Sequence, residues 1–217
     1  MNAKQLNWAK MTAVFCIIVC IADFMILFVL GNYYPGYSQL TNTMSSLGAS
    51  ISPVSNIISL WWIAIGIVFV FFGFQFRKAF DNNAKNVKIA SGLIMLYGLG
   101  EGIGSGVFKA DRIGGEMTSS FIVHDIAGSI GLLAALLLPL FMHKVISRKE
   151  NPFFYGLSWI VFVTGIITML LFTIRFSSDE TSLIIHFKGL WQRLFLLNLY
   201  VYFIAISIIM YHKKCRI

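Results

Sequence analysis

Residues 11–30 read MTAVFCIIVCIADFMILFVL, an apolar run whose only charged side chain is Asp23. A helix needs roughly 20 mostly apolar residues to cross the hydrocarbon core of a bilayer, and this run has that length. It is too long for the apolar part of a signal peptide, and no small-residue cleavage motif follows it. We therefore expect it to form a retained first transmembrane helix.

Five further apolar runs of similar length follow the first. The composition agrees, because 58% of the residues are hydrophobic and only 12% are charged, whereas soluble domains carry about 25% charged residues. The pattern predicts an all-α integral membrane bundle of six transmembrane helices, a single domain over residues 1–217 with no room for a soluble one. The predicted spans are residues 11–30, 57–76, 88–108, 120–142, 155–175 and 188–211.

Lysine and arginine are distributed unevenly between the two sides of such a bundle. With helix ends assigned to alternate sides, twelve of the 17 basic residues lie on one side and five on the other. Cytoplasmic loops carry the excess of basic residues, so both termini are predicted to be cytoplasmic. The basic tail with Lys213, Lys214 and Arg216 would attract anionic headgroups, so membrane lipids are the expected partners. The basic residues cluster at helix ends rather than in a stripe interleaved with aromatic residues, so we expect no nucleic-acid partner.

The connection between the first two spans has an unusual composition for a solvated loop. Residues 31–56 contain no Asp, Glu, Lys, Arg or His, but they include Tyr33, Tyr34, Tyr37 and Met44. A long uncharged loop with aromatic residues is typical of a segment at the membrane interface or against the bundle. We expect this first outer loop to be ordered and to act as a lid.

Ionisable residues within the spans lie at similar depths. Measured from the outer helix ends at 1.5 Å per residue, the acidic and basic side chains of four helices lie about 8–12 Å deep. Such residues are costly in a membrane and indicate functional sites, so we predict one polar pocket that opens outward. The predicted ligand-binding residues are Asp23, Ser45, Ser46, Glu101, His124, Asp125, Gln192 and Arg193.

Charge balance gives Arg193 a predicted role in this layer. Three carboxylates and one guanidinium cannot all stay ionised in a medium of low dielectric constant without partners. We expect Arg193 to pair with Glu101, Asp125 or Asp23. The alternative is a structural buried ion pair that fixes the order of the helices. The presence of such a pair does not by itself indicate activity.

The third predicted span contains a run of alternating glycines. Gly98, Gly102 and Gly106 share one face of a helix, and Gly100 and Gly104 share another. Small residues at this spacing allow helices to approach closely in lipid. No strand precedes the run, so a phosphate-binding glycine loop is rejected. On the same helix, Glu101 has Tyr97 four residues before it and Ser105 four residues after it, which predicts a polar strip.

His124 is open to several interpretations: a general base, a metal ligand or a structural histidine. A metal site needs three or four ligands, and the other histidines lie elsewhere along the chain, so no metal or cofactor is expected. A hydrolytic site is a further alternative, in which His124 and an aspartate would act on Ser45 or Ser46 of the first outer loop. No nucleophile-elbow spacing supports that arrangement.

Several short motifs, taken together in order, resemble a family of bacterial and archaeal membrane proteins known as domain of unknown function 998. They are residues 37–38 (YS), 44–49 (MSSLGA), 106–111 (GVFKAD), His124 and residues 189–194 (GLWQRL). Members often have an acid within the second motif and a proline after the phenylalanine of the third. Here Ser46 and Lys109 stand at these positions. The resemblance implies a six-helix protein of the bacterial or archaeal plasma membrane, and it supplies no activity.

Three functions therefore remain open. The leading interpretation is a non-catalytic membrane protein that binds a lipid or small ligand in the predicted pocket. The second is a proton-coupled small-molecule transporter, although the sequence shows neither a pair of broken helices nor an inverted repeat. The third is an intramembrane lipid hydrolase.

Overall fold

The computed structural model describes residues 3–80, 84–173 and 182–213, and most of these residues are helical. Within these ranges, five helices are long and apolar enough to cross a membrane. These apolar helices identify the chain as a membrane protein. The five helices are α1 (Ala3–Gly31), α2 (Ser55–Ala79), α5 (Ser119–Val145), α6 (Pro152–Thr173) and α8 (Lys188–His212).

The third predicted span, residues 88–108, is helical but not uniform. It consists of α3 (Lys85–Tyr97), a π-helical segment η2 (Gly98–Gly104) and one α-helical turn, α4 (Ser105–Val107). Because the change of helix type divides it, no single piece has the length of a span. The π-helix has a wider turn than the α-helix and occurs frequently at functional sites.

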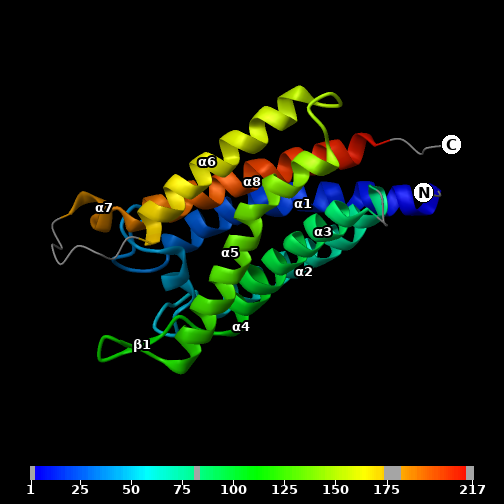
Figure 1. Cartoon of the computed structure of the whole chain (residues 1–217). Helices are drawn as coiled ribbons and strands as arrows, with labels where there is room; N and C mark the ends of the chain where they lie inside the picture. The colour runs from blue at the N-terminus through cyan, green and yellow to red at the C-terminus, as the bar shows by residue number, and fades with distance from the viewer. Residues whose placement is uncertain (1–2, 81–83, 174–181, 214–217) are drawn as a thin grey trace.

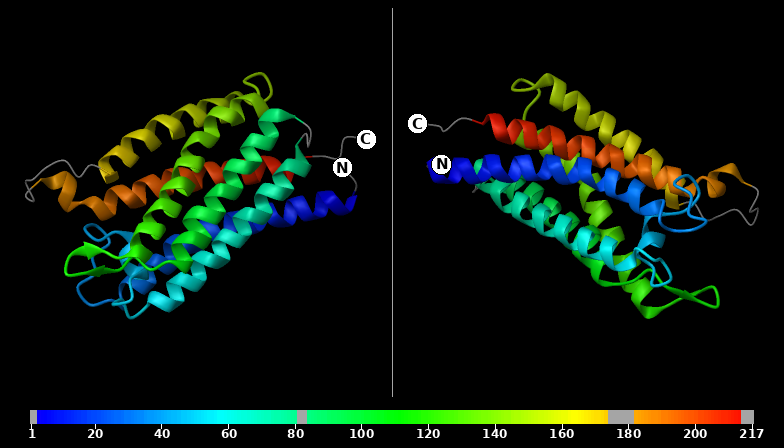
Figure 2. Two further views of the ribbon diagram at one scale, coloured as in Figure 1. Left: turned by 60° about the horizontal axis from the view of Figure 1, so that its bottom comes forward. Right: turned by 180° about the vertical axis from the view of Figure 1, so that it is seen from behind.

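The helices form a closed ring. Going around the bundle, α1 packs against α2, α2 against α3, α3 against α5, α5 against α6, α6 against α8 and α8 against α1 (Figures 1 and 2). The interior of the ring therefore receives side chains from every helix. The order around the ring follows the order of these helices in the sequence, and α8 closes the ring by packing against α1.

The two ends of the bundle differ. The start of α1 and the end of α8 lie at one end, and the first outer loop, a short hairpin and α7 (Leu183–His186) lie at the other (Figure 1). The hairpin pairs β1 (Arg112–Ile113) with β2 (Glu116–Met117). The prediction had no strands here. Gly114 and Gly115, with φ of +59° and +85°, form the turn that permits this pairing.

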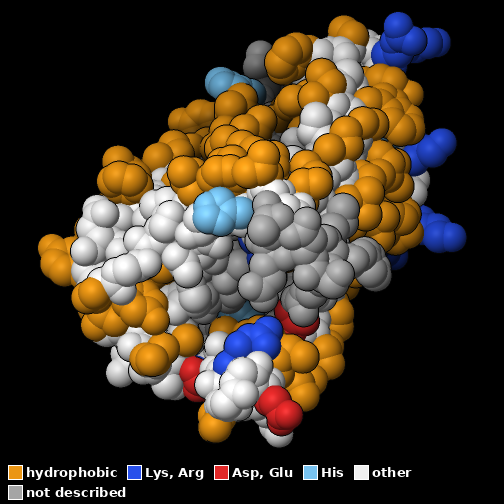
Figure 3. Space-filling model, turned by 90° about the vertical axis from the view of Figure 1, so that its left-hand side faces the viewer, with side chains coloured by type: hydrophobic (Ala, Val, Ile, Leu, Met, Phe, Trp, Pro, Cys, Tyr) orange, Lys and Arg blue, Asp and Glu red, His pale blue; other side chains and the backbone are white. Residues whose placement is uncertain are grey.

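The sides of the bundle are apolar. Large hydrophobic side chains such as Met25, Phe28, Leu60 and Phe71 are more than half exposed, as expected of residues that face lipid rather than water. Figure 3 looks onto the loop end, where polar side chains and backbone interrupt the hydrophobic surface. The last two residues of the predicted span 155–175, Ile174 and Arg175, lie outside the described residues, as do Lys214 and Arg216 of the basic tail.

The predicted close packing of the third span is confirmed on both of its faces. A Cβ added to Gly98 or Gly106 would lie 2.6–2.7 Å from backbone oxygens of α2. A Cβ added to Gly100 would lie 2.9 Å from the backbone nitrogen of Gly131 in α5. The glycines therefore let α3, η2 and α4 fit between α2 and α5.

An aromatic cluster fills the middle of the ring. Phe69 contacts Tyr97 and Phe203 with ring centroids 4.7 Å apart in both cases, and it stacks on Tyr200 at 6.4 Å. All four rings are 3% exposed or less. We call Phe69, Tyr97, Tyr200 and Phe203 the aromatic plug.

Candidate functional site

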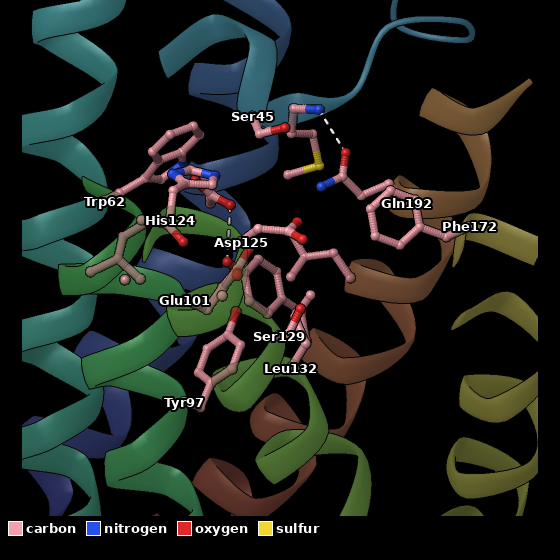
Figure 4. Close-up of a pocket in the computed structure, with 18 of the residues that line it drawn as sticks. Ser45, Trp62, Tyr97, Glu101, His124, Asp125, Ser129, Leu132, Phe172 and Gln192 are labelled. Carbon is pink, nitrogen blue, oxygen red and sulfur yellow. Dashed lines mark hydrogen bonds between the residues drawn. The ribbon is translucent and has the colours of Figure 1, made fainter. Parts of the chain in front are cut away.

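A cavity of about 80 Å³ lies inside the ring, on the loop side of the aromatic plug. We call it the inner chamber. Polar side chains from α1, α5, α8, the first outer loop and the α3–α4 segment point into it (Figure 4). Its polar lining consists of Asp23, Ser45, Tyr97, Glu101, Ser105, His124, Asp125, Ser129, Gln192 and Tyr200.

The structure brings together six of the eight residues predicted from the sequence and leaves two apart. Ser46 and Arg193 do not line the inner chamber. The six that do are Asp23, Ser45, Glu101, His124, Asp125 and Gln192.

Like Asp125, Glu101 has a carboxylate with no hydrogen-bond partner among the described residues. It lies at the centre of the π-helical segment η2, and no described residue donates a hydrogen bond to it. Its side chain fits because α5 has a glycine opposite: a Cβ on Gly128 would lie 2.9 Å from Glu101 Oε2 and 3.1 Å from Ser105 Oγ. An ionised carboxylate at this depth needs a positive charge nearby.

Asp23 has a different environment from Glu101. Its Oδ1 accepts a hydrogen bond from Trp61 Nε1 at 2.8 Å, and its Oδ2 accepts one from the Tyr200 hydroxyl at 2.9 Å. The side chain is only 1% exposed. Asp23 therefore joins α1, α2 and α8 as part of the chamber wall.

His124 is held in one orientation. Its Nδ1 lies 2.9 Å from the backbone oxygen of Phe108, which can only accept, so Nδ1 carries the proton. In the neutral ring Nε2 is then an acceptor, and no described residue hydrogen bonds to it. The ring is 7% exposed and stacks on Phe121 with a centroid distance of 6.1 Å.

Gln192 connects the chamber to the loop above it. Its Oε1 accepts a hydrogen bond from the backbone N–H of Met44 at 2.7 Å. Its amide nitrogen points toward the chamber (Figure 4), although the side chain is only 9% exposed. His124 and Gln192 thus both direct polar atoms without described partners into the cavity.

The predicted pairing of Arg193 with an acid is wrong. Its guanidinium donates instead to Gln39 Oε1 at 3.0 Å, to the backbone oxygens of Asn42 and Gly189 at 3.0 and 2.9 Å, and to the Tyr37 hydroxyl. Burial raises the pKa of the Tyr37 hydroxyl, and the adjacent guanidinium opposes that increase. Arg193 therefore fixes the first outer loop.

The first outer loop lies against the bundle. Leu190 N–H donates to the backbone oxygen of Leu40 at 2.8 Å, and the one-turn helix η1 (Met44–Gly48) buries Met44 and Leu47. The loop thus covers the outer end of the inner chamber. Tyr34 and Tyr37 are half-buried, but Tyr33 is 68% exposed.

The hydroxyl groups of the two predicted loop serines bond to Thr43 rather than to His124. Ser45 Oγ lies 3.0 Å from Thr43 Oγ1, and Ser46 Oγ donates to the Thr43 backbone oxygen at 2.6 Å. Neither serine has a hydrogen bond to the imidazole within the described ranges, so the geometry does not favour the hydrolytic arrangement.

A second cavity, of about 310 Å³, adjoins the inner chamber and is lined by residues of the loop end. We call it the outer chamber. The two cavities share Ser45, Phe121, Asp125 and Phe172 as lining residues. The side chains that only the outer chamber has include Tyr34, Thr43, Ser46, Arg112 and Lys188.

Two residues of the GVFKAD motif, to which the sequence analysis assigned no role in the site, join the outer loops. Asp111 accepts hydrogen bonds from Ser50 N at 2.6 Å and Ser50 Oγ at 2.7 Å. Lys109 Nζ donates to Ser55 Oγ at 2.7 Å and Ser59 Oγ at 2.8 Å. Burial lowers the pKa of Lys109, and the Asp111 carboxylate opposes that decrease.

Tyr200 was also missed as a lining residue, although a signal for it exists. Gln192, Leu196 and Tyr200 follow one another at intervals of four and line the chamber together. Residues four apart share a helix face, so the position of Gln192 could have led to Tyr200.

Comparison with known protein families matches residues 17–209 to the family described as "Protein of unknown function (DUF998)". No curated protein and no solved structure matches the chain.

Proposed function

We propose a function from the premise that this chain belongs to the family described as Protein of unknown function (DUF998), whose description assigns none. The protein is a multi-pass membrane protein whose inner chamber binds the amino group of a small ligand or lipid from the outer side. The observation that carries this proposal is the carboxylate of Glu101, which faces a cavity and has no described partner.

The orientation belongs to the proposal. Counting the helical residues 85–107 as a crossing gives six, and an even number agrees with both termini at one end of the bundle (Figure 1). The excess of basic residues on that side supports a cytoplasmic location for the termini. The cell membrane is then the bacterial or archaeal plasma membrane, and the chambers open away from the cytoplasm.

The charge of the lining favours a cation. The inner chamber is lined by three acids, Asp23, Glu101 and Asp125, and the described residues of its lining include no lysine or arginine. An anion would meet like charges in a medium of low dielectric constant, where repulsion is strong. A protonated amine would supply the positive charge that Glu101 lacks, and His124 Nε2 would accept one of its N–H groups.

Binding of ethanolamine to the purified protein in detergent tests the proposal. We expect Glu101→Gln to weaken binding at least tenfold in calorimetric titrations. The matched control is Glu116→Gln, because Glu116 lies on the exposed hairpin and its loss should leave the affinity unchanged. Equal affinity for the two variants and the wild type, or no binding by the wild type, would overturn the proposal.

A second candidate function, proton-coupled transport, is favoured by one observation. The helix that carries Glu101 is π-helical from Gly98 to Gly104, around that residue, and transporters often interrupt a helix at the substrate site. The aromatic plug closes the path beyond the chamber, so transport requires a second conformation. Uptake of labelled ethanolamine into proteoliposomes with an imposed proton gradient would support transport, and binding without uptake would rule it out.

A further inference from the structure

The two chambers adjoin each other, but the charges of their linings differ in sign. The inner chamber presents acids, whereas Arg112 and Lys188 line the outer chamber. Asp125 belongs to both and marks their border. A ligand that fills both chambers would therefore lie beside negative charges at its inner end and beside positive charges at its outer end.

The two cations are positioned by the aromatic walls that the chambers share. The Arg112 guanidinium lies over the Phe121 ring, 4.8 Å from its centroid, and Lys188 Nζ lies 6.0 Å from the centroid of Phe172. Arg112 also donates to the backbone oxygen of Gly115 at 3.1 Å, which ties it to the hairpin turn. Such cation–π contacts are attractive, and they hold the charges at the mouth of the inner chamber.

From this segregation we propose that the ligand is dipolar: a primary amine and a phosphate joined by a short chain. The inference rests on the function proposed above and names its ligand class. The amine occupies the inner chamber near Glu101, and the phosphate occupies the outer chamber between Arg112 and Lys188.

The sizes of the chambers agree with this assignment. About 80 Å³ admits an ammonium group with one or two carbon atoms, whereas about 310 Å³ admits a phosphate and what is attached to it. Thr43 and Ser45 also line the outer chamber, and because their hydroxyls bond to each other, one O–H of the pair remains to donate. Hydroxyl donors together with arginine and lysine are common ligands of phosphate oxygens. An ethanolamine phosphate has this chemistry, as a free molecule or as a lipid headgroup.

The test compares three probes: phosphoethanolamine, ethanolamine and inorganic phosphate. We expect phosphoethanolamine to bind at least tenfold more tightly than ethanolamine, and phosphate alone to bind weakly. The double variant Arg112→Met, Lys188→Met should bring phosphoethanolamine down to the affinity of ethanolamine without changing ethanolamine binding. The variant Arg112→Lys, Lys188→Arg keeps both charges and should retain most of the preference. Lys149→Met, on the exposed loop at the opposite end, is the matched control.

Each failure points to a different part of the argument. If the double Met variant binds phosphoethanolamine as the wild type does, or loses ethanolamine equally, the dipolar assignment is wrong. The proposed amine site then survives provided that ethanolamine binding still depends on Glu101. If neither amine binds in a Glu101-dependent way, the proposed function fails as well.

Nanodiscs distinguish the two sources of the ligand. If the source is a lipid headgroup, nanodiscs of phosphatidylethanolamine should suppress binding of added phosphoethanolamine relative to nanodiscs of phosphatidylglycerol. If the source is a free molecule, the two nanodiscs should bind phosphoethanolamine equally. Both results support the dipolar ligand and assign its origin.

Discussion

Gln192 and Arg193 are neighbours in the chain but serve different parts of the molecule. Consecutive residues of an α-helix point about 100° apart, so Gln192 faces the inner chamber and Arg193 faces the first outer loop. Depth along a helix can be estimated from sequence, whereas direction around it depends on neighbouring helices. For this reason the shared depth of the polar residues could be predicted, and the partner of Arg193 could not.

Arg193→Met should loosen the first outer loop. The loop would lose the charge-assisted hydrogen bonds to Gln39, Asn42 and Tyr37, each worth about 1.5–3 kcal/mol. We expect a lower Tm in detergent and faster hydrogen exchange over residues 37–46, with Arg148→Met as the exposed control. The effect should add to that of Glu101→Gln, because the two side chains do not interact. Partial recovery of Tm on adding Glu101→Gln would instead indicate that Arg193 and Glu101 interact, which the structure does not show.

The two deep acids should respond oppositely to neutral replacements. Asp23 accepts hydrogen bonds from Trp61 and Tyr200, and in Asp23→Asn the new NH₂ group would face one of these two donors. A buried polar group left without a partner costs about 1–3 kcal/mol. Glu101→Gln removes a charge that has no described partner, so Tm should stay constant or rise while ethanolamine binding falls. Thermal unfolding of the two variants in detergent checks this contrast, and a large loss of stability in Glu101→Gln would assign that carboxylate a structural role.

At the scale of elements, the third span shows what the spacing of residues can and cannot predict. The spacing of its glycines predicted two close-packed faces, and both are present. The change to π-helix at Gly98–Gly104 was not predicted, because it depends on the backbones of α2 and α5 that enclose the segment. No local pattern of residues records those tertiary contacts.

Two glycines of this span should tolerate alanine very differently. A Cβ on Gly102 would lie 2.7 Å from the Gly66 backbone nitrogen, whereas one on Gly92 would meet nothing within 4 Å. Overpacking against backbone costs about 1–3 kcal/mol, so Gly102→Ala should lower Tm. Gly92→Ala should leave it unchanged or raise it slightly, because alanine favours helix. Similar Tm values for both variants would contradict the close approach of α2.

At the scale of the whole molecule, hydropathy predicted the long helices and the ordered motifs indicated the family, which the match over residues 17–209 confirms. The ring order could not be predicted, since hydropathy measures the length of a span and not its neighbours. The outer chamber was missed for a related reason. Arg112, on the hairpin, and Lys188, at the start of α8, are far apart in sequence, and the fold brings them to one cavity.

The proposed topology can be tested by cysteine labelling. In a background without native cysteines, Ile51→Cys should react with a membrane-impermeant reagent in intact cells, because Ile51 is 82% exposed at the loop end. Lys149→Cys, which is exposed at the opposite end, should react only after lysis. Equal reaction of both positions in intact cells would contradict the six-crossing topology.

The depth of Glu101 in the bundle has an electrical consequence. An amine bound beside Glu101 would lie six residues from the end of α4 at Val107, roughly 9 Å inside a core of about 30 Å. A unit charge that crosses the entire membrane changes in energy by about 2.3 kcal/mol per 100 mV. The bound amine would therefore experience about a third of that voltage, roughly 0.7 kcal/mol per 100 mV. Its affinity would change only about threefold per 100 mV of membrane potential.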